Sequence, residues 1–136
     1  MAVRANYPSG VAGIQTILVN ADSTNWVDLY DNSVGSASVR VESLSICSDD
    51  TVTMNIQFGR NISSVTYLLG TVRAVTLVGT DGAVARINAL STIGTAAPDG
   101  VNVIEVPAGQ KLQAKVLIAV TAAKTVSITG WARLYV

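Results

Sequence analysis

Short runs in which apolar and polar residues alternate dominate this chain, and turn-forming residues separate them. The clearest run is 51–58, in which Val52, Met54, Ile56 and Phe58 alternate with Thr, Asn and Gln. A period of two places successive side chains on opposite faces of an extended chain, so each run predicts a strand with one buried face. About eight such runs at close spacing predict an all-β, antiparallel sandwich.

Two departures from simple alternation carry further predictions. In the run 39–46 the apolar phase shifts after Val41, which indicates a β-bulge or a strand that changes sheets. Apolar residues spaced by three at about 83–91 predict one short helical connection. The C-terminal runs 111–120 and 125–136 alternate strongly and are expected to be long strands.

The length of 136 residues fits a single domain. Residues 1–13 show no periodicity and contain Pro8, Gly10 and Gly13, which predicts an extended N-terminal arm. Residues 14–136 contain no linker that would separate a second domain. We therefore expect an arm at 1–13 and one sandwich domain at 14–136.

The titrating residues are too few for most enzyme chemistry. The chain has no histidine and a single cysteine, Cys47, so a Ser-His-Asp or Cys-His arrangement and a zinc site have no support. It also lacks a glycine-rich phosphate loop and a basic run, and its formal net charge is zero. We expect no enzymatic activity, no catalytic, cofactor-binding or metal-binding residue, and no nucleic-acid partner.

Charge is unevenly distributed along the chain. Residues 1–58 carry two basic and six acidic residues, whereas residues 59–136 carry seven basic and three acidic residues. If the two halves of the chain lay side by side in the fold, the acidic half of one subunit would attract the basic half of the next and favour head-to-tail contact. A sandwich that interleaves the two halves would remove this asymmetry, and we expect interleaving.

The apolar fraction of 49% is high for a neutral chain and suggests that a partner covers part of the surface, unless alanine and glycine inflate the value. No apolar stretch approaches the ~20 residues that a spanning helix needs, and the first residues lack a signal-peptide core. We expect no membrane partner and synthesis in a cytoplasm.

One segment resembles a known family. The strand that ends at Val106, the turn Pro107-Ala108-Gly109-Gln110 and the long strand after it resemble the C-terminal half of small jelly-roll proteins, and 121–128 fits the same pattern. With its length and few titrating groups, the chain is similar to head decoration (cement) proteins of tailed bacteriophages. The resemblance implies a jelly-roll subunit, often a homotrimer, that binds the major capsid protein on the outer surface of the virion. It implies no catalytic residue.

Aromatic and arginine side chains are the types that dominate binding hot spots. Trp26 and Tyr30 could instead be buried between the sheets, and we favour the core for Trp26; the final strand's outer face could also lie under a loop or the arm. The candidate interface residues come from the arm, the second strand and the final strand: Arg4, Tyr7, Trp26, Tyr30, Trp131, Arg133 and Tyr135.

A carbohydrate- or receptor-binding module of a virion is the alternative function. Its stacking platforms would be Trp26, Tyr30, Trp131 and Tyr135, with Asp28 or Asp49 binding hydroxyl groups. This alternative requires the aromatic side chains to lie in one concave patch.

Overall fold

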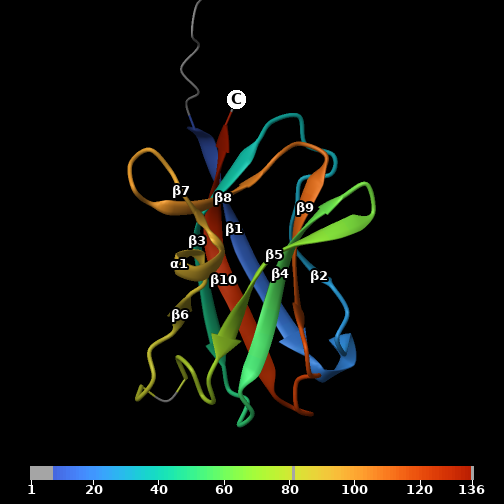
Figure 1. The fold of residues 1–136 in the computed structure, drawn as a ribbon, viewed down its shortest axis with the longest axis vertical. Helices are drawn as coiled ribbons and strands as arrows, with labels where there is room; N and C mark the ends of the chain where they lie inside the picture. Colours follow the sequence, from blue (N-terminus) through green and yellow to red (C-terminus); the bar gives the residue numbers. More distant parts are fainter. Residues whose placement is uncertain (1–7, 81, 136) are drawn as a thin grey trace, which may run out of the picture.

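Two antiparallel sheets face each other in the computed structural model, which describes residues 8–80 and 82–135 (Figure 1). The expected all-β antiparallel sandwich is therefore confirmed. The larger sheet has the order β1 (Pro8–Val19), β10 (Thr125–Tyr135), β3 (Val39–Ser48), β8 (Asn102–Val106) and β7 (Thr95–Ala96), with β6 (Ile87–Asn88) also paired to β3. The smaller sheet has the order β2 (Val27–Asp31), β9 (Gln110–Val116), β4 (Met54–Ile62) and β5 (Val65–Ala74).

The long strands pair in a nested order. The strand β1 pairs with β10, β2 with β9, β3 with β8, and β4 with β5, and all four pairs are antiparallel. Strands from the N-terminal and C-terminal parts of the chain therefore alternate, in the order β1, β10, β3, β8 in the larger sheet and β2, β9, β4 in the smaller sheet. This arrangement confirms the expectation that the two halves interleave.

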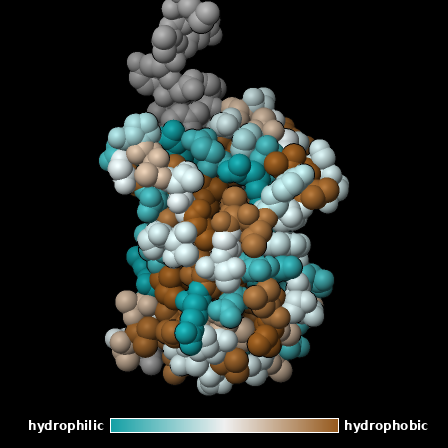
Figure 2. Space-filling model, in the orientation of Figure 1, coloured by the Kyte–Doolittle hydropathy of each residue, from teal (hydrophilic) through white to brown (hydrophobic). Residues whose placement is uncertain are grey.

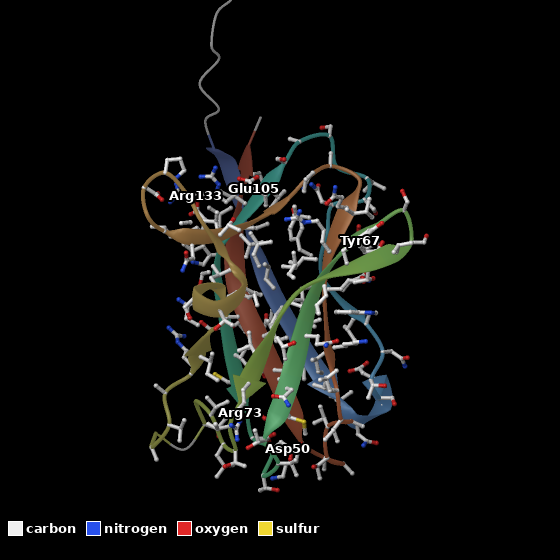
Figure 3. All side chains as sticks on the ribbon, viewed as in Figure 1. Asp50, Tyr67, Arg73, Glu105 and Arg133 are labelled. Carbon is white, nitrogen blue, oxygen red and sulfur yellow. The ribbon has the colours of Figure 1, made fainter. Side chains whose placement is uncertain are left out.

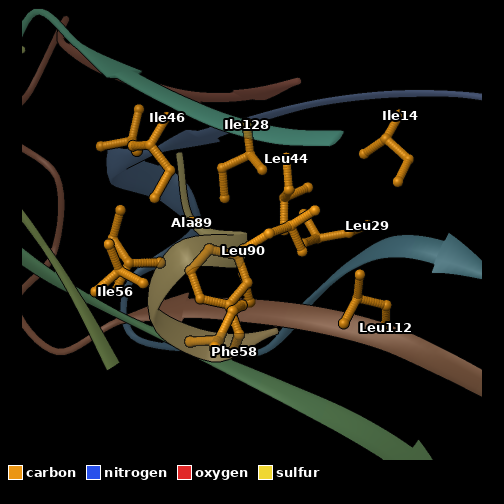
Figure 4. Close-up of a cluster of buried hydrophobic side chains, with 14 of the residues drawn as sticks. Ile14, Leu29, Leu44, Ile46, Ile56, Phe58, Ala89, Leu90, Leu112 and Ile128 are labelled. Atoms are coloured by element: carbon orange, nitrogen blue, oxygen red, sulfur yellow. The ribbon is translucent and has the colours of Figure 1, made fainter. Parts of the chain in front are cut away.

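Alternation along the strands builds the core. Leu112, Ala114 and Val116 of β9 point inward and are buried, whereas Gln113 and Lys115 between them point outward. Figure 4 shows the packing of buried side chains from both sheets around Phe58. The fully buried side chains of largest volume are Phe58, Leu18, Leu44, Ile46, Met54, Ile56, Leu90, Leu112, Ile128, Val39, Val41 and Val78.

The phase shift in β3 is a β-bulge. Trp131 of β10 lies opposite Ser43, and Ala132 lies opposite Val41, so Glu42 is the additional residue. The bulge restores the inward phase at Leu44, which is buried together with Val41. The first of the two explanations for the shift is therefore correct.

The predicted arm is wrong for the part that the structure describes. The strand β1 begins at Pro8, and Gly10 to Val19 pair regularly with β10. The glycines leave this segment without an alternating pattern, so its local preference for a strand is weak. Pairing with β10 overrides that weak preference because it supplies the backbone hydrogen bonds of a strand. Residues 1–7 lie outside the described residues.

Two other expected elements have different bounds. The helical passage at about 83–91 is limited to the α-helix α1 (Leu90–Ile93), and Ile87–Asn88 forms β6 instead. The amide of Ala89 donates to the carbonyl of Leu44, which ties this segment to β3. The expected strand 111–120 ends at Val116, because the chain leaves the sheet there. A 3-10 helix, η1 (Asn20–Asp22), joins β1 to β2.

Candidate functional site: exposed faces and the apolar end

The outer face of the larger sheet holds two of the expected interface residues. Trp131 is 36% exposed, and the Arg133 guanidinium lies 5.5 Å from the centre of its ring. The bulge brings Glu42 beside this pair, with its Oε2 2.8 Å from Arg133 Nε. These residues, together with Arg40, Asp99, Val101 and Val103, line an open pocket of about 390 Å³.

A second ion pair lies on the same face. Arg40 Nε is 3.0 Å from Glu105 Oε1 on the neighbouring strand β8. Figure 3 shows Glu105 and Arg133 near each other at the upper end of the sandwich. This part of the face therefore carries a neutral group of paired charges around one exposed indole. The side chain of Tyr135 is outside the described residues, as are Arg4 and Tyr7.

Trp26 lies on the other side of the molecule. Its neighbour Val27 packs against the core, so the indole lies on the outer face of the smaller sheet, and its Cη2 atom lies over Gly59. Lys115 places its Nζ 4.7 Å from the centre of the ring. The expectation that Trp26 is a core residue is wrong, because the strand phase gives the inward position to Val27. Tyr30 does pack against the core.

The expected aromatic residues thus do not form one patch. Trp26 and Trp131 lie on outer faces of different sheets, and Tyr30 packs inward. The concave arrangement that the carbohydrate-binding alternative requires is absent among the described aromatic residues.

A polar network lies on the outer face of the smaller sheet around β2 and β9. The Gln113 amide donates to Asp28 over 2.6 Å, and its carbonyl oxygen accepts from the Thr66 hydroxyl over 2.8 Å. Lys111 Nζ lies 3.2 Å from Asp28 and 3.7 Å from Asp31. The hydrogen bond to Asp28 is the largest cause that raises the pKa of Lys111, and hydrogen bonds from Ser33 lower the pKa of Asp31. The network satisfies its own charges, as expected of a solvated face.

The lower end of the sandwich in Figure 1 exposes apolar residues, none of which is among the expected interface residues. Three loops, which follow β3, β5 and β9, meet there, and they expose Val52, Val75, Leu117 and Ile118. We call these four residues the apolar end. Figure 2 shows hydrophobic residues beside hydrophilic ones over the lower part of the face that it presents. Residues 75–80 and 117–123 contain no charged residue, and this uncharged sequence was the available signal.

Asp50 holds the loops of the apolar end together. Its carboxylate accepts hydrogen bonds from the amides of Val52 and Thr121 over 2.9 and 2.8 Å and from the Thr121 hydroxyl over 2.9 Å. Its own carbonyl accepts from the amide of Leu77 over 3.1 Å. Burial raises the pKa of Asp50, but the hydrogen bonds from Thr121 and Val52 outweigh burial and leave the pKa below its usual value. Figure 3 shows Asp50 at this end.

Two kinds of feature are absent from the part of the chain that the structure describes. The described residues contain no group of three or more His, Cys, Asp or Glu side chains that could hold a metal ion. Within the same part of the chain, no helix is long and apolar enough to cross a membrane. The sequence matches no family model and no curated protein.

Proposed function

We propose that this protein is a non-enzymatic structural protein of a bacteriophage virion that binds and reinforces the outer surface of the capsid. The observation that carries the proposal is the apolar end, a set of four exposed apolar side chains on three loops that hydrogen bonds to Asp50 fix in place. Contiguous exposed apolar surface on a soluble domain commonly marks a site of protein interaction.

The fold and the resemblance support the same function. We infer that the nested strand pairing, first with last and second with next to last, is a jelly roll, built from eight long strands in two sheets. This is the fold that the resemblance to head decoration proteins implies. The homotrimer that the resemblance also implies stays a prediction.

The geometry of the apolar end suits tight docking. Val52, Leu117 and Ile118 lie on loops that share hydrogen bonds with Asp50 or with β4, so few rotamers and little backbone freedom are lost on binding. Contact with several copies on one capsid would add avidity, because linked sites raise the effective concentration.

Binding to undecorated capsids of its own phage tests the proposal. The wild-type protein is expected to bind saturably, with a fixed number of copies per capsid. The double variant Leu117→Asp/Ile118→Asp should bind about 100-fold or more weakly, because each buried Leu or Ile contributes roughly 1.5–3 kcal/mol.

Val34→Asp is the matched control. Val34 is 96% exposed but lies in the loop 32–38 at the opposite end of the sandwich, so its replacement should leave capsid binding unchanged. Absence of saturable binding by the wild-type protein would reject the function. Unchanged binding by the Leu117→Asp/Ile118→Asp variant would reject the apolar end as the docking surface.

Carbohydrate or receptor binding is the second candidate, now restricted to the smaller sheet. The Trp26 ring and Thr66 both lie over Gly59, and Thr66 leads through Gln113 to the Asp28 carboxylate. An aromatic ring beside amide and carboxylate groups suits a sugar. A glycan array with the wild-type protein and Trp26→Ala tests this candidate, which fails if no glycan binds or if the variant binds equally.

A further inference from the structure

The strand β1 is an edge strand without the usual protection. It is twelve residues long, lies at one edge of the larger sheet, and contains no charged residue. Its register with β10 is regular from Gly10 to Val19, so no bulge interrupts it there. Edge strands are normally short, charged, bulged or covered, because free N–H and C=O groups otherwise recruit another strand.

The other edges of the described sheets carry such protection. The edge strand β2 has five residues, two aspartates and a register shift. The edge strand β5 contains Arg73 and a register shift, and Ile93 of α1 packs against its Gly70. At the far edge of the larger sheet, β7 has two residues. The register shift of β1 is confined to its first residues, between Pro8 and Gly10, so from Gly10 to Val19 β1 differs from the other described edges in being long, uncharged and regularly paired.

The contact of β1 with the smaller sheet leaves its backbone edge available. The Thr16 hydroxyl donates to the Asp28 carbonyl over 3.5 Å, which places β2 beside this part of β1. In the described residues β1 has backbone pairing with β10 alone. Its second row of backbone groups can therefore accept another strand.

The side chains of β1 complement a second copy of the same strand. An antiparallel pair centred on Ile14 would place Val11 opposite Ile17 of the partner, and Gly13 opposite Gln15. Val11 and Ile17 point outward and are 69% and 52% exposed. Directly opposed apolar side chains stabilise antiparallel pairs, and β1 contributes no charge that would repel its own copy.

We propose that β1 pairs antiparallel with β1 of a second copy, which continues the larger sheet across a two-fold axis. The occupant is a second copy rather than a foreign chain because this register forms two equivalent contacts, each between Val11 of one copy and Ile17 of the other. The contact is isologous, so it closes as a dimer.

The mass of the protein in solution tests this assembly. Light scattering or sedimentation should give twice the 14.1 kDa of the chain. Val11→Lys/Ile17→Lys places lysines opposite each other at both ends of the pair and should weaken dimerisation about 100-fold or more. Val11→Glu/Ile17→Glu should do the same with negative charge.

Mixing the lysine and glutamate variants tests the register. Each residue 11 then meets a residue 17 of opposite charge, so the mixture should recover the dimer mass although each variant alone is monomeric. Recovery also shows that both variants fold. Asn55→Lys/Gln57→Lys is the matched control, because these side chains point outward from β4 on the smaller sheet and should leave the dimer intact.

The outcomes separate this inference from the proposed function. A wild-type monomer, a lysine variant that remains dimeric, or a mixture that stays monomeric would overturn the pairing of β1. A trimer unaffected by the lysine substitutions would overturn it as well, while supporting the homotrimer expected from the resemblance. Capsid binding is measured separately at the apolar end, so either proposal can fail alone.

Discussion

At the scale of single residues, Asp50 joins segments that are distant in the sequence. Its carboxylate binds Thr121, 71 residues away, and also Val52 two residues away. Turn aspartates commonly bond only to their own backbone. Only the return of the chain after β9 brings Thr121 within reach, so the apolar end depends on a long-range contact.

Replacement of Asp50 is expected to lower stability. In Asp50→Asn one carboxylate oxygen becomes an amino group that faces amide donors, so buried donors lose partners at a cost of about 1–3 kcal/mol. Urea unfolding at neutral pH measures the loss. Asp99→Asn is the control, because Asp99 accepts a comparable bond from the Val101 amide on an exposed loop, and it should change stability by less than about 0.5 kcal/mol.

The same substitution has an expected pH dependence. The pKa of Asp50 is lower in the folded protein than its usual value, so its contribution to stability is complete above about pH 4 and is lost as pH falls through the folded pKa. The stability difference between wild type and Asp50→Asn should therefore shrink in acid. A difference that stays constant down to about pH 2 would contradict this account.

At the scale of elements, the bulge in β3 requires a glycine on the neighbouring strand. A Cβ atom at Gly130 of β10 would lie 1.8 Å from the Ser43 backbone oxygen, beside the bulge. At Gly13, on the other side of β10, a Cβ atom would meet nothing within 4 Å. The two glycines look alike in the sequence, but only one of them is required by the packing.

Alanine substitutions distinguish these glycines. Gly130→Ala must push β10 away from β3, which should cost about 3 kcal/mol. Gly13→Ala should be neutral or slightly stabilising, because alanine reduces the freedom of the unfolded chain. Thermal or urea unfolding measures both, and equal effects of the two substitutions would show that the contact with Ser43 is not limiting.

At the scale of the whole molecule, the ion pairs join the two halves of the chain. Arg40 with Glu105, Arg133 with Glu42, and Lys111 with Asp28 and Asp31 each link one acidic or basic residue of 1–58 to a partner in 59–136. Acidic and basic residues of the two halves thus pair between neighbouring strands within each sheet.

These pairs are partly exposed, so we expect them to add little stability. An exposed ion pair contributes roughly 0–1 kcal/mol to the free energy of unfolding. At about 1 M salt the Debye length is ~3 Å, so the attraction between the paired charges is largely screened. Raising the concentration of sodium chloride from about 0.1 M to about 1 M should lower the melting temperature by less than about 5 °C. A larger fall would indicate that the paired charges, rather than the core, hold the halves together.

The sequence by itself determined the fold class, most of the inward-facing strand positions and the place of the irregularity in β3, whereas the structure decided that this irregularity is a bulge. Period-two alternation identifies the inward face within the strands, as at Met54, Ile56 and Phe58 of β4, but it fails at Val52 and Ile118, which lie in loops and are exposed. The phase shift after Val41 marks where the additional residue lies. These features are local, because strand geometry alone relates neighbouring side chains to opposite faces. The positions of the apolar end and of the exposed aromatic residues depend instead on contacts between segments that are far apart in the sequence.

Tertiary structure alone decided where β1 begins, where β9 ends, and on which outer face Trp26 lies. The turn between β4 and β5 was equally hidden, because Ser63 and Ser64 adopt positive φ angles of 51° and 68° without a glycine or asparagine. The ladder with β10 makes a glycine-containing segment a strand, and the bonds between Asp50 and Thr121 fix a loop where alternation predicted more sheet. Pairing and burial depend on partners far along the chain, so a local pattern cannot encode them.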